Sequence, residues 1–255
     1  MKAVLFKNIV VVLIAVFASV NLFGQPGFVD MQKANEKIAE VFNRRADSLK
    51  KELAAKKINW PIQAIYIRSF KFDRVMEIWV KGEFSNAFSL FKNYKVCAQS
   101  GTAGPKRMEG DYQVPEGIYY INEFNPNSNY HLSLGLNYPN ASDRILSDPL
   151  RPGSEIYIHG SCVSVGCIAI DDPNIEELYV LASHAKAAGQ DFIPVHVFPV
   201  NYNEKKSLEY LANTAKSNVA LQRFAAKLKT VFTYFEENNN LPVITVNKKG
   251  EYTVY

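Results

Sequence analysis

The 255-residue chain has few cysteines and only a slight excess of one charge. Three cysteines cannot build a disulfide-rich scaffold, and their odd number leaves at least one thiol free or paired between molecules. Lysine and arginine number 29 against 25 aspartates and glutamates, an excess too small to require nucleic acid as a partner. Apolar residues make up 47%, and the 13 glycines and 12 prolines are dispersed, which excludes disordered, collagen-like and coiled-coil proteins. The composition predicts an ordinary globular protein with a substantial core.

Long hydrophobic runs are also lacking. The most apolar stretch, residues 9–18, follows Lys2 and Lys7 and is shorter than the roughly 20 residues that a membrane span needs. Gly24 offers a small residue at a cleavage point, so the pattern predicts a signal peptide over residues 1–24, with an uncleaved N-terminal anchor as the alternative. Removing its two lysines leaves 27 basic residues (29 minus 2) against 25 acidic ones, a mature charge of +2. The basic character therefore says little about partners.

Hydrophobic periodicity predicts helices at both ends of the mature chain and strands between them. Apolar residues at three- and four-residue spacing predict helices over residues 31–56 and 208–237. A third helix is expected to start with Asp172 as N-cap and Pro173 at the first helical position, and to end at Gly189. Residues 137–144 are predicted as a loop, and β-rich runs are predicted as strands at 64–68, 74–80, 88–98, 118–121, 130–136, 155–159, 167–170 and 192–200.

This arrangement predicts an α+β fold with a mostly antiparallel sheet. We divide the mature chain into an N-terminal helical segment at residues 25–61, a core domain at 62–200 and a C-terminal helical extension at 201–255. The core contains the strands, so we expect any chemistry to lie there.

The residues best suited to chemistry lie at positions 156–170, Ile-Tyr-Ile-His-Gly-Ser-Cys-Val-Ser-Val-Gly-Cys-Ile-Ala-Ile. His159 closes one predicted strand and Cys167 opens the next, so a reversal of the loop between them would bring the imidazole near the thiol. An imidazole that takes the thiol proton increases the thiolate fraction, which is the reactive form. Gly166 leaves room for a substrate carbonyl, and the N–H groups of Gly166 and Cys167 would form an oxyanion hole.

Three other interpretations of these residues stay open. A cysteine in a buried strand is usually a small hydrophobic residue. A zinc site is the second interpretation, although the spacing matches none of the strong paired patterns, with ligands drawn from His159, Cys162, Cys167 and either His184 or His196. The third is a disulfide, either Cys162–Cys167 or Cys97–Cys162, and the second of these pairings leaves Cys167 as the odd thiol.

These residues resemble a known family. The His-Gly pair followed by Ser-x-Gly-Cys is similar to the signature of L,D-transpeptidase catalytic domains, cysteine enzymes that cross-link or trim bacterial peptidoglycan. The similarity is greatest to the YafK-like murein transpeptidase branch, in which a short loop separates the histidine from the cysteine. Further similar segments follow in the family's order at residues 100–111, 115–119, 138–144 and 175–179. The resemblance covers about residues 62–200 and implies the sandwich-like catalytic core of that family.

The resemblance also implies roles for individual residues. Cys167 would be the nucleophile and His159 the general base and acid. The Gly160 carbonyl would hold the imidazole, and Ser164 occupies the position of the motif serine, next to Gly166.

Two departures from the family pattern affect substrate recognition. Many members have a histidine directly before the Gly-Cys pair and an arginine two residues after the cysteine, whereas this chain has Val165 and Ala169 there. Lys106 and Arg144, which lie in matching loops, are the candidates to bind the substrate carboxylate in place of that arginine.

As a whole, the resemblance implies peptidyl transfer on peptidoglycan stem peptides in the periplasm or at the cell wall. It implies no metal and no cofactor, no nucleic acid partner and no membrane contact after signal removal. Two alternatives remain: an L,D-carboxypeptidase or amidase that hydrolyses stem-peptide or wall-protein links, and a non-catalytic wall-binding module. A papain-like hydrolase is disfavoured because its cysteine precedes its histidine. The oligomeric state does not follow from the sequence.

Overall fold

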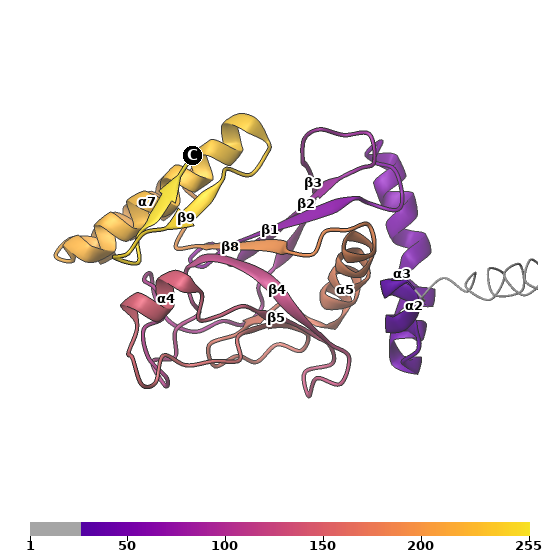
Figure 1. Ribbon diagram of the computed structural model, residues 1–255, viewed down its shortest axis with the longest axis horizontal. Helices are drawn as coiled ribbons and strands as arrows, with labels where there is room; N and C mark the ends of the chain where they lie inside the picture. Colours follow the sequence, from indigo (N-terminus) through magenta and orange to yellow (C-terminus); the bar gives the residue numbers. More distant parts are fainter. Residues whose placement is uncertain (1–26) are drawn as a thin grey trace, which may run out of the picture.

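The computed structural model describes residues 27–255, so the signal peptide expected at residues 1–24 lies outside the described part (Figure 1). The predicted first helix is two helices, α2 (Phe28–Lys33) and α3 (Glu36–Ala55). The break falls at Asn35, whose side chain accepts a hydrogen bond from the Ile38 N–H and thereby caps α3. Within residues 27–255, no helix has the length and hydrophobicity that crossing a membrane requires.

The core is one eight-stranded sheet that curls around itself (Figure 1). Its strand order is β3-β2-β1-β8-β4-β5-β6-β7. The predicted α+β class with a mostly antiparallel sheet is confirmed, because only the β1–β8 and β6–β7 pairs are parallel. The strands are β1 (Ala64–Phe70), β2 (Val75–Lys81), β3 (Ser89–Lys95), β4 (Gly117–Asn125), β5 (Ser133–Leu136), β6 (Tyr157–His159), β7 (Ile168–Ala169) and β8 (Ile193–Phe198).

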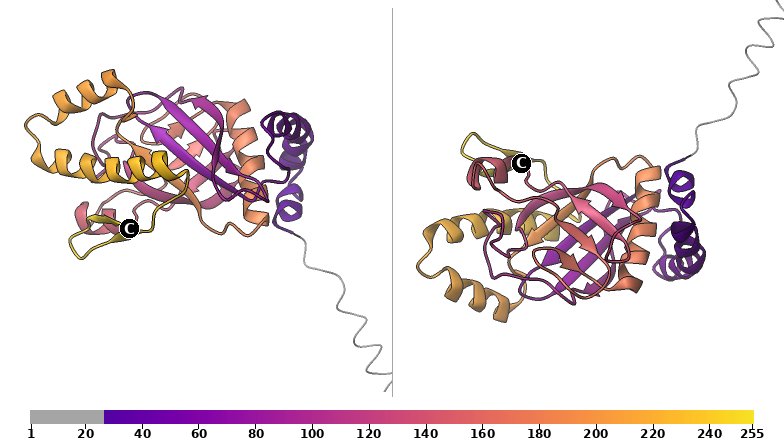
Figure 2. Two further views of the ribbon diagram at one scale, coloured as in Figure 1. Left: turned by 90° about the horizontal axis from the view of Figure 1, so that it is seen from above. Right: turned by 90° about the horizontal axis from the view of Figure 1, so that it is seen from below.

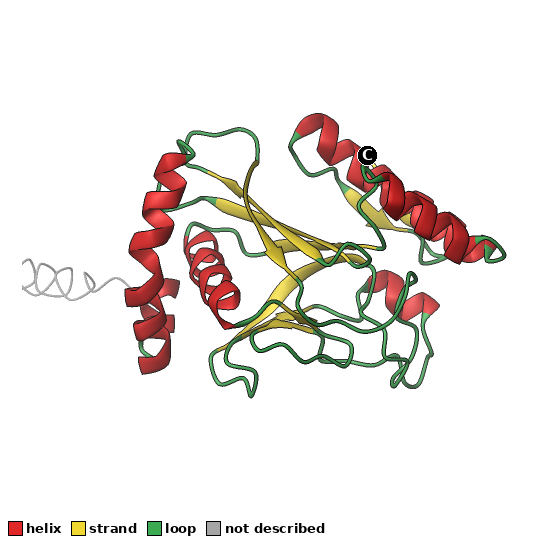
Figure 3. Cartoon of the chain, turned by 180° about the vertical axis from the view of Figure 1, so that it is seen from behind, coloured by secondary structure: helices red, strands yellow, loops and turns green. Residues whose placement is uncertain are grey.

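Helix α5 (Asp172–Ala187) packs between the sheet and the N-terminal helices (Figure 3). Its N-cap is Asp171, not Asp172 as predicted: the Asp171 side chain accepts from the Asn174 N–H at 3.1 Å. The Asp172 carboxylate instead accepts a hydrogen bond from the Ser161 N–H at 2.7 Å. The two adjacent aspartates therefore have different roles: Asp171 caps α5, and Asp172 stabilises the loop that follows β6.

The C-terminal extension is not wholly helical as predicted. Helices α6 (Lys205–Ala215) and α7 (Val219–Asn238) are followed by a hairpin of β9 (Ile244–Val246) and β10 (Tyr252–Val254). Figure 2 shows this extension at the opposite end of the molecule from α2 and α3. The predicted loop at residues 137–144 contains the start of a further helix, α4 (Ala141–Leu146), which has a capping box between Asn140 and Asp143.

A buried arginine joins the extension to the sheet. Arg68 of β1 forms salt bridges of 2.6 Å with Glu77 of β2 and with Glu236 of α7. Its guanidinium also lies 4.9 Å from the ring centroids of Trp79 and Phe235. Charge pairing and cation–π contact together compensate for the burial of the guanidinium, which fixes α7 against the sheet.

Candidate active site

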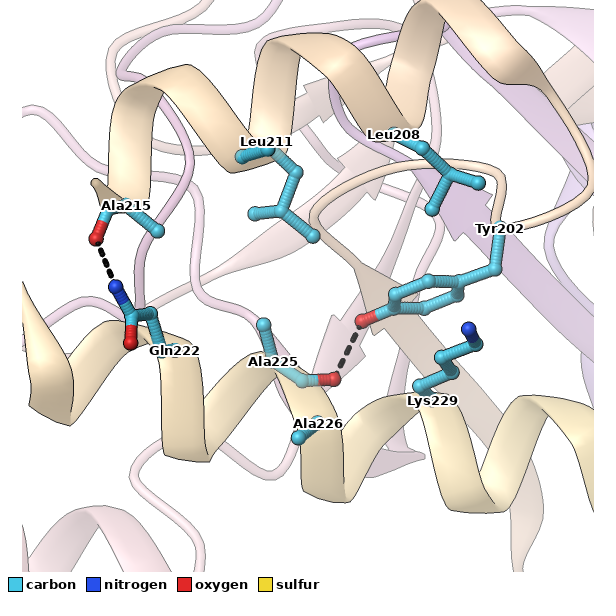
Figure 4. Close-up of a pocket in the computed structure, with 9 residues that line it drawn as sticks. Tyr202, Leu208, Leu211, Ala215, Gln222, Ala225, Ala226 and Lys229 are labelled. Carbon is cyan, nitrogen blue, oxygen red and sulfur yellow. Dashed lines mark hydrogen bonds between the residues drawn. The ribbon is translucent and has the colours of Figure 1, made fainter.

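The apolar cavity between α6 and α7 lacks the groups expected of a catalytic centre. Its volume is about 390 Å³, and Figure 4 shows its wall of leucine and alanine side chains. The polar contacts there serve structure: the Tyr202 hydroxyl donates to the Ala225 carbonyl at 2.8 Å, and the Gln222 amide donates to the Ala215 carbonyl at 2.8 Å. No nucleophile paired with a base lies in its lining, so we place the chemistry elsewhere.

A second cavity, of about 320 Å³, contains both residues singled out in the sequence. Cys167 and His159 line it together with Tyr157, the loop between β4 and β5, Ser133 and Glu155. The sheet brings them together because β6 and β7 pair in parallel, with His159 opposite Ala169, two residues after Cys167. Because the two strands run parallel, the loop does not make the simple reversal expected from the sequence; it crosses back to lay β7 beside β6.

A disulfide ties down the loop that joins the two residues. Cys97 and Cys162 are bonded, with their Cα atoms 5.6 Å apart, and Cys167 is the free cysteine. Of the two pairings left open by the sequence, this is the one that spares the proposed nucleophile. It also removes Cys162 from any zinc site. Cys97 is also tied to β7, because its N–H donates to the Ala169 carbonyl at 2.9 Å.

The His159 ring is held in one tautomer. Its Nδ1 lies 2.6 Å from the Gly160 carbonyl oxygen, as the resemblance implied. A carbonyl can only accept, so Nδ1 carries the proton and Nε2 keeps its lone pair. Burial lowers the pKa of His159 from its ordinary value, and the Gly160 carbonyl partly opposes that effect. The imidazole is therefore a neutral base near neutral pH.

The Cys167 thiol is also neutral at rest. Burial raises its pKa, and the negative charge of Glu155 raises it further, against a hydrogen bond from the backbone of Tyr157 that lowers it. The thiol donates to the Glu155 carbonyl at 3.7 Å, so its proton must turn away from that carbonyl to reach His159. The pair thus begins as thiol and imidazole, not as thiolate and imidazolium.

Tyr130 is a part of the site that sequence reasoning missed. Its ring packs on the His159 imidazole with centroids 4.7 Å apart and an interplanar angle of 32°. It belongs to the loop between β4 and β5, which also contributes Asn127, Ser128 and Asn129 to the cavity wall. Asparagine and serine in this run signal a loop. Nothing local, however, indicates that the loop lies over a histidine 29 positions later in the chain.

Glycines and serines fix the backbone on both sides of the thiol. Gly166 has φ +102°, a conformation that favours glycine, and its N–H donates to Ser100 Oγ at 2.8 Å. That N–H is therefore already satisfied, which leaves the Cys167 N–H as the candidate oxyanion donor of the predicted pair. Ser164 Oγ donates to the Cys167 carbonyl at 2.6 Å and so orients the residue that carries the thiol.

Gly160 is required by its surroundings. A Cβ at this position would lie 2.5 Å from Asp172 Oδ1 and 2.8 Å from the Tyr130 carbonyl oxygen. The glycine thus permits the close approach of three chain segments behind the imidazole.

The two residues predicted to bind a carboxylate do not line this cavity. Lys106 is buried, donates to the Met108 carbonyl and pairs with Asp111 at 2.5 Å. Arg144 is exposed on α4, which packs beside the C-terminal hairpin. The cavity's charged lining residue is instead Glu155.

Known proteins resemble this chain in sequence. The sequence model of the L,D-transpeptidase catalytic domain matches residues 73–197. An Escherichia coli K12 protein named "Putative L,D-transpeptidase YafK" is 31% identical over 192 residues, which is 74% of this chain and 73% of that protein.

Two solved structures are also similar. The helical cell shape determining protein Pgp2 from Campylobacter jejuni is 19% identical, with a TM-score of 0.41 over 78% of this chain and 81% of the other. Bdellovibrio bacteriovorus Bd1075 is 21% identical, with a TM-score of 0.39 over 70% and 63%. The identity and coverage of the YafK match, together with the domain match around His159 and Cys167, make this chain a member of the L,D-transpeptidase family.

Proposed function

We propose that the protein is a cysteine peptidyltransferase that acts on peptidoglycan stem peptides. The observation that carries the proposal is the placement of the free thiol of Cys167 in one cavity with His159, whose Nε2 is unprotonated. A neutral base and a neutral thiol can exchange a proton as the sulfur attacks, in the manner of a serine and histidine pair.

The proposed reaction proceeds through a thioester. Cys167 Sγ attacks the carbonyl carbon of the third stem residue, a diamino acid linked through its L-centre, while the thiol proton passes to His159 Nε2. The bond to the terminal D-alanine then breaks, and His159 returns the proton to the leaving amine. An acceptor amine attacks the thioester, gives its proton to His159 and forms the new amide as the thiol is regenerated. The Cys167 N–H is the proposed donor to the oxyanion.

Hydrolysis is a second candidate outcome, favoured by the charge of the cavity. Its lining contains the carboxylate of Glu155 and no lysine or arginine, and Ala169 stands where many family members have arginine. Such a lining holds a free substrate carboxylate poorly. It suits an amide whose leaving amine belongs to a longer chain, such as a link to a wall protein, with water as the acceptor.

We also propose that the protein acts after export, in the periplasm or at the cell wall. The Cys97–Cys162 disulfide supports this location, because such bonds persist in oxidising compartments. The N-terminal segment with signal-peptide character agrees with it.

The test is incubation of the purified protein with tetrapeptide muropeptides, followed by mass spectrometry of the products. Cross-linked dimers indicate transpeptidation, and tripeptides without dimers indicate hydrolysis. We expect Cys167→Ala to abolish both products and Cys162→Ala to retain them. The opposite pattern would reject Cys167 as the nucleophile. A folded protein that forms no product and whose Cys167 resists alkylation would be a wall-binding module without catalysis.

A further inference from the structure

A cavity of about 630 Å³, larger than the two described above, lies away from the thiol, between α4, α7 and the C-terminal hairpin. These three elements lie together at one end of the molecule in Figure 1. The hairpin is fixed there by Ser142, whose hydroxyl donates to the Gly250 carbonyl at 2.6 Å, and by the buried Tyr252, whose hydroxyl accepts from Asn140 at 2.9 Å. The cavity shares no lining residue with the one that holds Cys167.

The lining of this cavity is basic. Four cationic side chains contribute to it, against the single carboxylate of Glu251: Arg107, Arg223, Lys227 and Lys249. Arg107 is paired with Asp143 at 3.2 Å. The other three are exposed and form no ion pair with any described residue. The cavity therefore keeps an excess of positive charge available to a ligand.

An aromatic surface accompanies the charge. Phe224 and Tyr252 both contribute to the lining, and the Arg107 guanidinium lies 5.7 Å from the Phe224 ring centroid. This contact and the Asp143 pair hold Arg107 in place, so its remaining N–H groups are preorganised for a planar anion such as a carboxylate. The hollow is of the size that encloses a small ligand or a short peptide, which a flat lipid surface would not fill.

We propose that this cavity binds the acidic stem peptides of peptidoglycan and anchors the polymer while Cys167 acts on a different stem. The identity of the polymer rests on the proposed function. The carboxylates of the stems provide the opposite charge, and several stems on one polymer would engage both cavities at once, which strengthens attachment without new contacts.

One loop connects the two places. Residues 97–114 carry Ser100, which accepts the hydrogen bond from the Gly166 N–H beside the nucleophile, and also Arg107 of the basic cavity. The buried Lys71 anchors this loop by donating to the carbonyls of Gly104 and Val114 at 2.9 and 2.8 Å. One anchored loop thus contributes to both places.

The test measures co-sedimentation of the full chain with purified sacculi, in a Cys167→Ala background that prevents turnover. Arg223→Glu with Lys249→Glu is the test variant, and Lys216→Glu with Lys248→Glu is the control, which makes the same charge change at exposed positions outside the cavity lining. We expect about tenfold weaker binding for the test variant than for the control. Equal binding of the two variants would overturn the proposal.

Three further measurements keep the result interpretable. Binding of the otherwise unchanged Cys167→Ala protein should weaken as salt rises to about 0.3 M, and salt-independent binding would contradict a charge-based site. The parent protein and the test variant are also compared for binding to phosphatidylglycerol vesicles. If the test variant loses vesicle binding but keeps sacculus binding, the cavity binds lipid and the proposal is overturned. Muropeptide turnover by the unsubstituted protein is assayed separately. Sacculus binding without turnover would reject the proposed function alone, and turnover without charge-dependent binding would reject this inference alone.

Discussion

Removal of the Cys97–Cys162 disulfide should destabilise the protein by an amount that the structure allows us to estimate. The two cysteines are 65 positions apart, and closing a loop of that length in the unfolded chain corresponds to about 4 kcal/mol of stabilisation. For a chain of this size, a loss of that amount lowers the melting temperature by about 10 °C. Cys97 is half-buried and Cys162 is exposed, so serine at either position adds no strongly buried polar group.

The assay is urea unfolding followed by tryptophan fluorescence, for Cys97→Ser, Cys162→Ser and the double variant. All three lose the same cross-link, so their free energies of unfolding should fall by the same amount. Thiol titration of the unfolded, unreduced wild type should detect one free thiol, Cys167. Wild-type stability in the double variant, or three thiols before reduction, would refute the reasoning.

Three further predictions concern the site and the core. Burial lowers the pKa of His159 below 6.5 and raises the pKa of Cys167 above 9.0. The value of kcat/KM should therefore stay constant between pH 6.5 and pH 9.0. If kcat/KM falls to half its maximum at a pH above 7 on the acid side, the resting pair is not neutral. Glu155→Gln should lower the pKa of Cys167 and speed its alkylation by iodoacetamide at pH 8, since it removes a nearby negative charge; an unchanged or slower rate would exclude that effect. Glu116→Gln should lower the free energy of unfolding in urea by about 3 kcal/mol, because Lys71, 3.1 Å away and also buried, loses its counter-charge. A loss below about 1 kcal/mol would show that the buried lysine does not depend on the charge of Glu116.

The sequence predicts the central part of this fold well because the signals there are local. Alternation along Val75–Lys81 gives a strand with alternating burial, and Pro173 in the first turn marks the start of α5 within one residue. The C-terminal hairpin escapes prediction because each of its strands has only three residues, too few to show a period of two. Helix α4 has only six residues, although the capping box of Asn140 and Asp143 would have revealed it.

Some contacts of the site can be predicted from the sequence and others cannot, as for the fold. His159 and Cys167 flank one loop and can be singled out from the sequence, and the family resemblance implied the contact between the Gly160 carbonyl and the imidazole. The packing of Tyr130 on the imidazole depends on chain segments that meet only when the sheet forms. Long-range contacts of this kind leave no period or spacing in the sequence.

The position of the disulfide has a consequence for the order of folding. In the unfolded chain, Cys162 has a neighbour five positions away in Cys167, whereas its native partner Cys97 is 65 positions away. Short loops close more readily than long ones, so an oxidant that acts before the sheet forms favours the Cys162–Cys167 pair, which consumes the thiol that is free in the folded chain. The folded sheet reverses that preference by placing Cys97 beside residues 161 and 169. A free Cys167 thiol therefore depends on the order of events: the chain must fold first and be oxidised second, or have its disulfide reshuffled.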